Sequence, residues 1–342
     1  MEKISFFTRE QENKVPILNK RDNWMRLMKG EIPEYIPAYA AWAASPPFMR
    51  GTRNPDGTGT SIFGVEQVIG SGIVPAAMPK THDFILEDIT KWREIVKVPD
   101  TSDVDWAMLA NDAQNAHNPE NPWGAGCGVG VFQTLVALMG FTEGLVACYE
   151  EPEEVKDMLN YITDWMVANA KQVLYHYKPE YGAYGDDIAH ERNPFISLEM
   201  FRDIFAPCWR RYYEVFAEAG IPCTMHNCGH FEEFIDDVVN MGVWFWEPSQ
   251  STNDLLALKA RYGTRLAICE GFELRFFDSA VTEEEVRALF RARMDEMAPG
   301  GAYCNFEFDP TGGGIPSFTP RQIEILSWTW DEFEKIRYSY YN

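Results

Sequence analysis

The chain has 342 residues, 46% of them hydrophobic, so it is long enough to bury a full core as one large domain or two modest ones. Acidic residues outnumber basic ones by 52 to 30, which gives a formal net charge of −22. Because a protein that holds nucleic acid needs a basic surface and no Lys/Arg-rich run occurs here, DNA and RNA partners are excluded.

Neither a secretory signal nor a membrane span is expected. The N-terminal residues lack an apolar core of signal-peptide length, and no later stretch approaches the roughly 20 apolar residues that cross a bilayer. Seven cysteines, an odd number, make no disulfide framework for a chain of this size. We therefore expect a cytoplasmic protein whose reduced thiols are available as metal ligands.

The N-terminal half contains few clear elements. Residues 1–32 are expected to form a helical extension, and Tyr35–Trp42 is the best candidate strand. Val68–Met78 and Val129–Leu138 are weaker strand candidates. Glu150–Tyr177 is predicted to be a long helix, with Pro152 near its first turn.

From about residue 180, short apolar runs alternate with amphipathic stretches. The expected strands are Tyr181–Ala189, Ile221–Cys228, Val243–Pro248, Arg265–Glu273 and Gly301–Phe308, and the expected helices are Leu198–Gly220, Phe231–Met241, Thr252–Tyr262 and Thr282–Met297. Such alternation indicates parallel strands with crossover helices. No linker or repeat divides the chain, so residues 1–342 are predicted to be a single α/β domain, an eight-stranded (β/α)8 TIM barrel of about 250 residues with an N-terminal extension and inserted loops.

One predicted strand ends in a pair of metal-binding residue types. Residues two apart in a strand face the same side, so His226 and Cys228 project together at its carboxyl end, followed by Gly229, which permits a sharp turn. Active sites of barrels lie at that end. An imidazole beside a thiolate suits zinc, whereas the alternative is a core histidine next to an inert buried cysteine.

The following strands bring further ligand types to the same rim. Glu247 is the one carboxylate of an otherwise apolar strand, and it is expected either to bind a metal or to pair with an arginine across the barrel. Since zinc takes four ligands, or three and an open position, His226, Cys228 and Glu247 are predicted ligands, with Cys304 as the fourth and Cys269 as its alternative.

Several segments together resemble the uroporphyrinogen decarboxylase superfamily, in the right order and over nearly the whole chain. They are Arg26-Leu-Met-Lys-Gly30-Glu-Ile-Pro33-Glu-Tyr-Ile-Pro37, Tyr184-Gly-Asp186-Asp187, His226-Asn-Cys228-Gly229 and Gly312-Gly-Gly-Ile315-Pro-x-x-Thr319-Pro320. The resemblance implies a β/α barrel that is either a heme-pathway decarboxylase or a zinc-dependent methyltransferase working with a corrinoid protein.

Two departures argue against the decarboxylase. Those enzymes carry a segment of the form Arg-Gln-Ala-Gly-Arg after the first strand, where this chain has Trp42-Ala-Ala-Ser-Pro-Pro-Phe-Met-Arg50-Gly. They also carry a histidine in the terminal glycine-rich loop, where this chain has Gly312–Gly314. A net charge of −22 would in addition repel a polyanionic porphyrinogen.

The methyltransferase branch is the better match. Its zinc ligands are a His-x-Cys pair, a Glu about twenty residues later and a final Cys, which this resemblance carries onto His226, Cys228 and Glu247. The final Cys aligns with Gly313, so Cys304, a water or a substrate atom would take the fourth position. The cobalamin has to come from a partner corrinoid protein, since Gly124-Ala-Gly-Cys-Gly-Val-Gly130 lacks dinucleotide-motif spacing.

The predicted reaction moves a methyl group between a small neutral or cationic methylated substrate and the cobalt of that partner, as in anaerobic one-carbon metabolism. Aromatic residues near strand ends favour a methoxylated aromatic and O-demethylation, although large barrels also use aromatics in their cores. The alternatives are a methylcorrinoid:thiol methyltransferase and a decarboxylase or lyase. The resemblance also permits a homodimer.

Two further groups of site residues are predicted. Asp186 and Asp187 are candidate catalytic residues, and because neighbours in a strand face opposite ways, one of them is expected inside. The candidate substrate-binding residues are Tyr39, Trp42, Tyr184, Trp246 and Glu270.

Overall fold

The computed structural model describes residues 17–40, 43–70, 77–270, 280–306 and 319–341. Its centre is a curled sheet of seven parallel strands in the order β1-β11-β10-β9-β8-β7-β6. Their bounds are β1 Ala38–Tyr39, β6 Gly124–Ala125, β7 Tyr181–Gly185, β8 Cys223–His226, β9 Val243–Glu247, β10 Ala267–Glu270 and β11 Tyr303–Phe306. One backbone bridge, between Ala44 and Ala125, joins the segment after β1 to β6.

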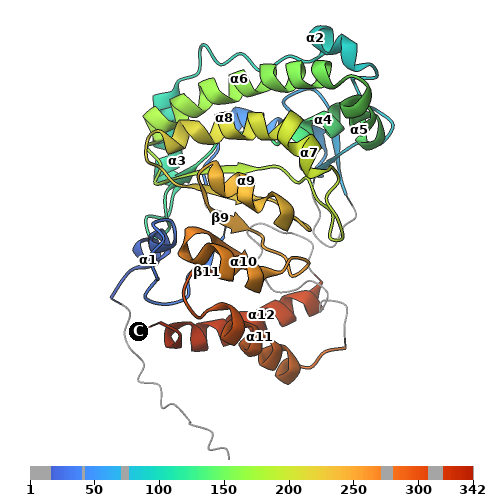
Figure 1. Ribbon diagram of the computed structural model, residues 1–342. Helices are drawn as coiled ribbons and strands as arrows, with labels where there is room; N and C mark the ends of the chain where they lie inside the picture. Colours follow the sequence, from blue (N-terminus) through green and yellow to red (C-terminus); the bar gives the residue numbers. More distant parts are fainter. Residues whose placement is uncertain (1–16, 41–42, 71–76, 271–279, 307–318, 342) are drawn as a thin grey trace, which may run out of the picture.

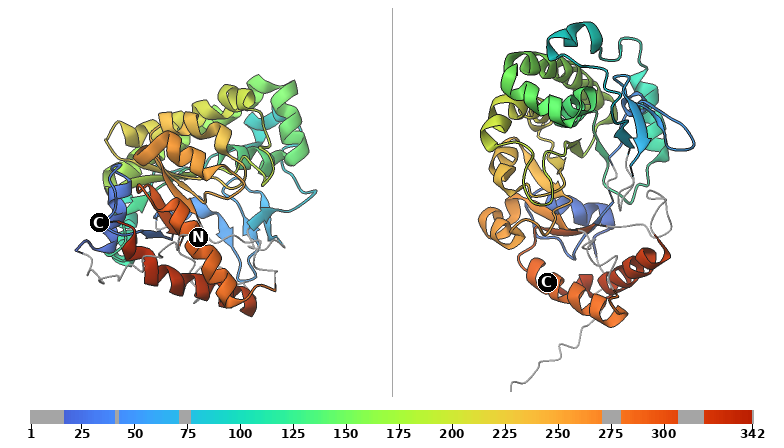
Figure 2. Two further views of the ribbon diagram at one scale, coloured as in Figure 1. Left: turned by 60° about the horizontal axis from the view of Figure 1, so that its bottom comes forward. Right: turned by 90° about the vertical axis from the view of Figure 1, so that its right-hand side faces the viewer.

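Most helices lie on the outer side of this sheet, as Figure 1 and Figure 2 show, whereas α1 packs on the residues inside it. The bounds of the helices are α1 Lys20–Leu27, α2 Trp92–Ile95, α3 Trp106–Ala116, α4 Val131–Met139, α5 Phe141–Glu150, α6 Pro152–Tyr177, α7 Leu198–Met200, α8 Ala206–Ala217, α9 Ile235–Asn240, α10 Leu255–Tyr262, α11 Glu283–Met297 and α12 Pro320–Ile336. The α/β alternation expected from residue 180 onward is confirmed. The fold is TIM-barrel-like, but within the described residues the parallel sheet has seven strands and does not form a closed eight-stranded barrel.

One expectation for the N-terminal half is wrong, and a second holds only in part. Val129–Leu138, predicted as a strand, is helix α4, because a short apolar run is compatible with either element. Part of Val68–Met78 belongs to a separate antiparallel sheet, seen in Figure 2, and not to the barrel sheet. That small sheet consists of β2 Thr52–Arg53, β3 Gly59–Thr60, β4 Glu66–Ile69 and β5 Ala77–Pro79.

Aromatic side chains fill the inside of the curled sheet. Trp24 of α1 stacks on Tyr39 at a ring distance of 5.6 Å and contacts Phe245 at 5.1 Å, which fixes α1 against the strands. Loops that precede β8 and β9 line a cavity of about 870 Å³ beside α1. This packing stabilises the amino ends of the strands and leaves their carboxyl ends for a site.

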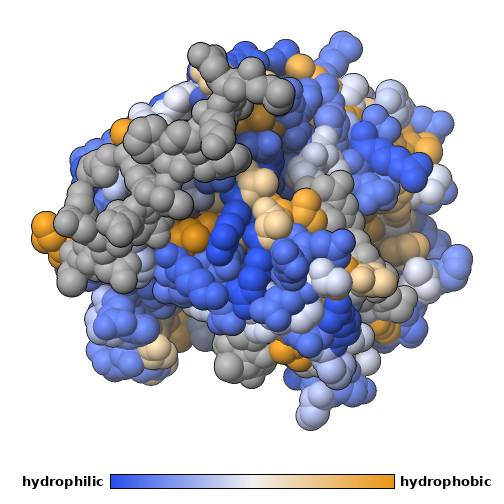
Figure 3. Space-filling view, turned by 90° about the horizontal axis from the view of Figure 1, so that it is seen from below, coloured by the Kyte–Doolittle hydropathy of each residue, from blue (hydrophilic) through white to orange (hydrophobic). Residues whose placement is uncertain are grey.

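The face in Figure 3 is mostly hydrophilic, and apolar side chains reach it in small groups. Within the described part of the chain, no single helix is long and apolar enough to cross a membrane; α4 and α5 pass that test only as a pair, which is bent by 108°.

Candidate metal centre

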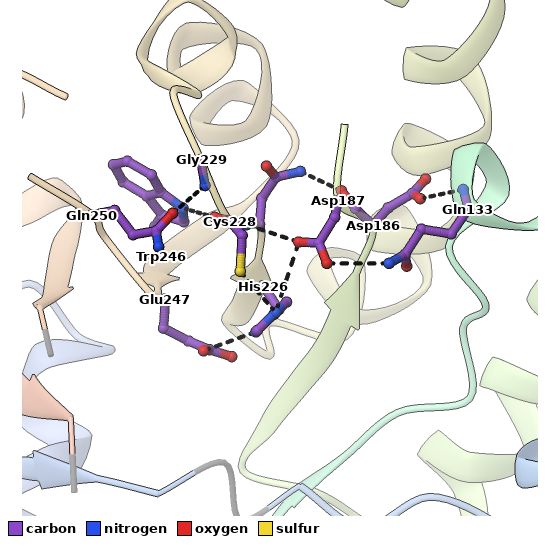
Figure 4. A network of polar contacts seen from close by, with 10 residues as sticks. Gln133, Asp186, Asp187, His226, Cys228, Gly229, Trp246, Glu247 and Gln250 are labelled. Atoms are coloured by element: carbon purple, nitrogen blue, oxygen red, sulfur yellow. Dashed lines mark hydrogen bonds and ion pairs between the residues drawn. The ribbon is translucent and has the colours of Figure 1, made fainter. Parts of the chain in front are cut away.

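Three metal-binding side chains meet where strands β7 and β8 end (Figure 4). Asp187, His226 and Cys228 each offer one ligand atom, and these atoms all lie within 4.8 Å of one another. The ring Nε2 of His226 is 3.7 Å from Sγ of Cys228 and 3.8 Å from Oδ1 of Asp187. The strand register thus brings an N, an S and an O donor together.

His226 is the last residue of β8 and is fixed from both neighbouring strands. It is paired with Gly185 of β7, where an added Cβ would lie 3.0 Å from the Cβ of His226, so the glycine leaves room for the imidazole. On the other side it is paired with Glu247 of β9, and its Nδ1 is 3.0 Å from Oε2 of that residue. Burial opposes protonation of the ring, but Glu247 and Cys228 outweigh it and raise the pKa of His226 well above the usual value.

Cys228 sits in a tight turn that directs its thiol toward His226. Its backbone N–H donates to Oδ1 of Asp187 at 2.8 Å. The next residue, Gly229, has φ +86°, and a Cβ there would lie 2.7 Å from the carbonyl oxygen of His190. The turn therefore requires glycine. Burial raises the pKa of the Cys228 thiol, although the hydrogen bond to His226 lowers it.

Asp187 divides its two carboxylate oxygens between different donors. Oδ1 accepts the Cys228 N–H, and Oδ2 accepts a hydrogen bond from Nε2 of Gln133 at 3.1 Å. Gln133 lies in the first turn of α4. The side chain of Asp187 is thereby tied to both β8 and α4 and is turned toward the imidazole.

Asp186 points away from this group, as expected for the neighbour of Asp187. Its carboxylate is fully buried and accepts hydrogen bonds from the backbone N–H groups of Phe132 and Gln133 at 2.9 and 3.0 Å and from the Trp209 indole at 3.0 Å. Burial raises the pKa of Asp186 to about 7, and these three hydrogen bonds act in the opposite direction. Asp186 thus joins β7 to the amino end of α4.

The glycine-rich stretch before α4 serves this packing. A Cβ at Gly128 would lie 2.4 Å from the Tyr184 ring, and one at Gly130 would lie 2.5 Å from Oδ1 of Asp186. These glycines therefore let the segment approach β7 closely. The N–H groups of Phe132 and Gln133 at the start of α4 are bound by the Asp186 carboxylate.

The donor set fits zinc. Zinc accepts imidazole nitrogen, thiolate and carboxylate ligands, and its catalytic sites combine three protein ligands with an open position. A zinc-bound histidine commonly donates its other ring N–H to a carboxylate, which is the relation of His226 to Glu247. Only 6% of the Glu247 side chain is exposed, against 45% for His226, so the exposed side of this pair is that of His226.

The other predicted ligands lie apart from this group. In the described structure Glu247 contacts Nδ1 of His226 and does not belong to the set of three. Cys269 and Cys304 are register partners on β10 and β11, fully buried among the aromatic residues inside the sheet. Their strands are further round the sheet, which explains why neither thiol joins His226 and Cys228.

The candidate substrate-binding residues are spread over different environments. Tyr184 and Trp246 do not line the mouth: Tyr184 packs on Trp209 of α8, and Trp246 donates to the carbonyl of Asn227 at 3.0 Å. Tyr39 belongs to the buried cluster inside the sheet. The remaining two are Glu270, whose buried carboxylate accepts from Nε of Arg293 at 2.9 Å, and Trp42, which lies outside the described residues.

Sequence reasoning missed Gln133. The residue lies in a segment expected to be a strand, and its contact with Asp187 spans 54 positions in the chain. No local sequence motif predicts a contact between residues so far apart in the chain. The proximity of Asp187 to Cys228 could have been predicted from the sequence, since both residues follow the ends of strands that are neighbours in the sheet.

Comparisons with known proteins agree with this fold. The profile of the uroporphyrinogen decarboxylase (URO-D) family matches residues 61–269. Among solved structures, the chain is similar to a methyltransferase from Methanosarcina mazei, with a TM-score of 0.59 over 93% of this chain and 99% of that chain. The sequence identity is 13%, so this likeness concerns the fold. No curated protein matches the chain.

Proposed function

Because the chain belongs to the uroporphyrinogen decarboxylase family, we propose that it is a zinc-dependent methyltransferase of that fold. It moves a methyl group between a small methylated substrate and the cobalt of a separate corrinoid protein. The substrate that we favour is a methoxylated aromatic, so that the reaction is an O-demethylation. The observation that carries the proposal is the meeting of Asp187, His226 and Cys228 within 4.8 Å.

The protein residues have distinct roles in this proposal. Cys228, His226 and Asp187 hold the zinc through Sγ, Nε2 and an oxygen, while Glu247 keeps Nδ1 of His226 protonated and the ring oriented. When bound there, zinc supplies a Lewis acid that stabilises the charge on a departing oxygen or holds a thiol as thiolate. Glu247 as a further ligand, with Cys304 or Cys269 as a fourth, stays a prediction.

A corrinoid partner is proposed because the methyl acceptor has to come from outside. The glycine-rich stretch Gly124–Gly130 packs tightly on β7, which supports a structural use of these glycines. The exposed side of His226 gives a docked cobalt access to the site. A partner that carries cobalt therefore fits this site better than a cofactor held by the chain.

The charge of the chain bears on the substrate. A net charge of −22, together with carboxylates at Asp187 and Glu247, disfavours a polyanionic porphyrinogen and favours a neutral or cationic molecule. Methyl transfer to a thiol uses the same zinc site and is the nearest alternative. A decarboxylase would need neither zinc nor cobalt.

Zinc analysis and a methyl-transfer assay test the proposal together. Purified protein is expected to carry about one zinc per chain and to convert cob(I)alamin to methylcobalamin with a methoxyarene as the methyl donor. Methylamines and methyl thiols are tested as methyl donors in the same assay. His226→Ala and Cys228→Ala variants should lose both properties, whereas His230→Ala, whose ring contacts the carbonyl of Thr252, should keep them. Full zinc content and full activity in both site variants would falsify the proposal.

A further inference from the structure

Gln133 donates hydrogen bonds to the carboxylates of both aspartates at the end of β7. Its backbone N–H donates to Oδ1 of Asp186 at 3.0 Å, and its side-chain Nε2 donates to Oδ2 of Asp187 at 3.1 Å. The side chain is exposed, unlike its neighbours Phe132 and Thr134 in α4. The exposed amide of Gln133 thus contacts the half-buried carboxylate of Asp187 at the candidate metal centre.

We propose that Gln133 is a positioning residue for the metal: its amide holds Asp187 so that Oδ1 faces His226 and Cys228. This inference rests on the proposed function, because it concerns the proposed zinc site. Oδ1 lies 3.8 Å from Nε2 of His226, while Oδ2 is directed to Gln133. Oδ1 also accepts the backbone N–H of Cys228 at 2.8 Å, and the Gln133 amide, as a second neutral donor on Oδ2, stops the carboxylate from turning about its Cβ–Cγ bond.

The backbone of Gln133 is fixed at the start of α4. The buried carboxylate of Asp186 binds the first N–H groups of α4 and the Trp209 indole, which pins the start of the helix against β7 and α8. Gly130 makes this approach possible, since a Cβ there would lie 2.6 Å from Oε1 of Gln133 and 2.5 Å from the Asp186 carboxylate. The amide is therefore presented to Asp187 from a rigid helix end.

Mutation can remove the side-chain contact of Gln133 with Asp187 without removing its backbone contact with Asp186. A substitution removes only the amide contact with Asp187, because the backbone N–H that binds Asp186 survives in every variant. Gln133→Leu keeps a similar volume at this exposed position. Gln133→Glu places a second carboxylate next to Asp187 and repels it. A loss of metal binding in these variants would therefore report on the side chain and not on the anchoring of α4.

The test measures metal affinity and the spectrum of bound cobalt(II). Zinc is titrated against a chromophoric chelator, and Co²⁺ is used as the spectroscopic probe through its ligand-field and thiolate-to-metal bands. Gln133→Leu is expected to bind zinc about 10- to 100-fold more weakly and to show a changed ligand-field spectrum, with Gln133→Glu weaker still. Gln172→Leu, at an exposed glutamine of α6, is the matched control and should leave both unchanged.

Asp187→Asn separates the failure of this inference from that of the proposed function. If Asp187→Asn weakens zinc binding while Gln133→Leu stays within twofold of the unsubstituted protein with the same cobalt spectrum, the role of Gln133 is overturned and the zinc site stands. If the unsubstituted protein binds neither zinc nor cobalt at this group, both proposals are overturned. Thermal melting of each variant checks that lost binding is not lost folding.

Discussion

The Nδ1 atom of His226 lies 3.0 Å from Oε2 of Glu247, and the two residues are direct partners in the pairing of β8 with β9. Glu247 is almost fully buried on the inner side of this contact, whereas His226 is half exposed. The carboxylate therefore fixes the ring from behind and leaves Nε2 toward Cys228 and Asp187. This relation assigns Glu247 a role that differs from that of a direct ligand.

Glu247→Gln separates these two roles. The amide keeps the shape of the side chain and can still accept from Nδ1, so a supporting partner should cost about 10-fold to 100-fold in zinc affinity and leave the metal bound at high concentration. Competition with a chelator measures this affinity. Glu233→Gln, at an exposed position, is the control. A complete loss of zinc from Glu247→Gln would instead make Glu247 a ligand.

The C-terminal half of the fold could be predicted because its periodicity is strong. The apolar runs and amphipathic stretches from residue 180 onward correspond to β7–β11 and α8–α11. The same strand periodicity placed His226 and Cys228 on one side, where their ring and thiol lie 3.7 Å apart. The local pattern of apolar and polar residues was sufficient to predict these strands, helices and the His226–Cys228 pair.

The remaining features depend on contacts between distant parts of the chain. β6 has only two residues, Gly124 and Ala125, too short for any periodicity, and α4 is apolar on most sides because it is buried. Which side Tyr184 and Trp246 face depends on the helices packed behind them. The role of Gln133 follows from the position of α4 against β7, which no single segment encodes.

Asp186 and Asp187 are expected to differ sharply in their effect on stability. Asp186→Ala leaves the buried N–H groups of Phe132 and Gln133 and the Trp209 indole without their acceptor, which should lower the free energy of unfolding by about 3 kcal/mol. Asp187→Ala removes a partly exposed side chain and should cost about 1 kcal/mol. Urea denaturation of metal-free protein measures both. Equal losses would contradict the structural role of Asp186.

Gly130→Ala tests whether the glycine-rich stretch exists for close packing. The new Cβ would lie 2.5 Å from Oδ1 of Asp186, so the aspartate or the start of α4 must shift, at a cost of about 2 kcal/mol. Gly144→Ala in α5 is the matched control, since its Cβ would meet its nearest neighbour at 3.5 Å and the helix gains from alanine. Denaturation curves should therefore move in opposite directions. A neutral Gly130→Ala would mean that the contact with Asp186 is dispensable.

Zinc should stabilise the folded chain through the same three residues. At a free zinc concentration about 100-fold above the dissociation constant, binding to the folded state adds about 2.7 kcal/mol, which corresponds to a rise of about 4 °C in the melting temperature for a chain of this length. Thermal melting with and without zinc, after chelator treatment, measures the rise. Cys228→Ala should abolish the rise, because the sulfur ligand is lost, and His230→Ala should retain it, because its ring contacts Thr252 outside the group. A rise that persists in Cys228→Ala would place the stabilising metal elsewhere on the chain.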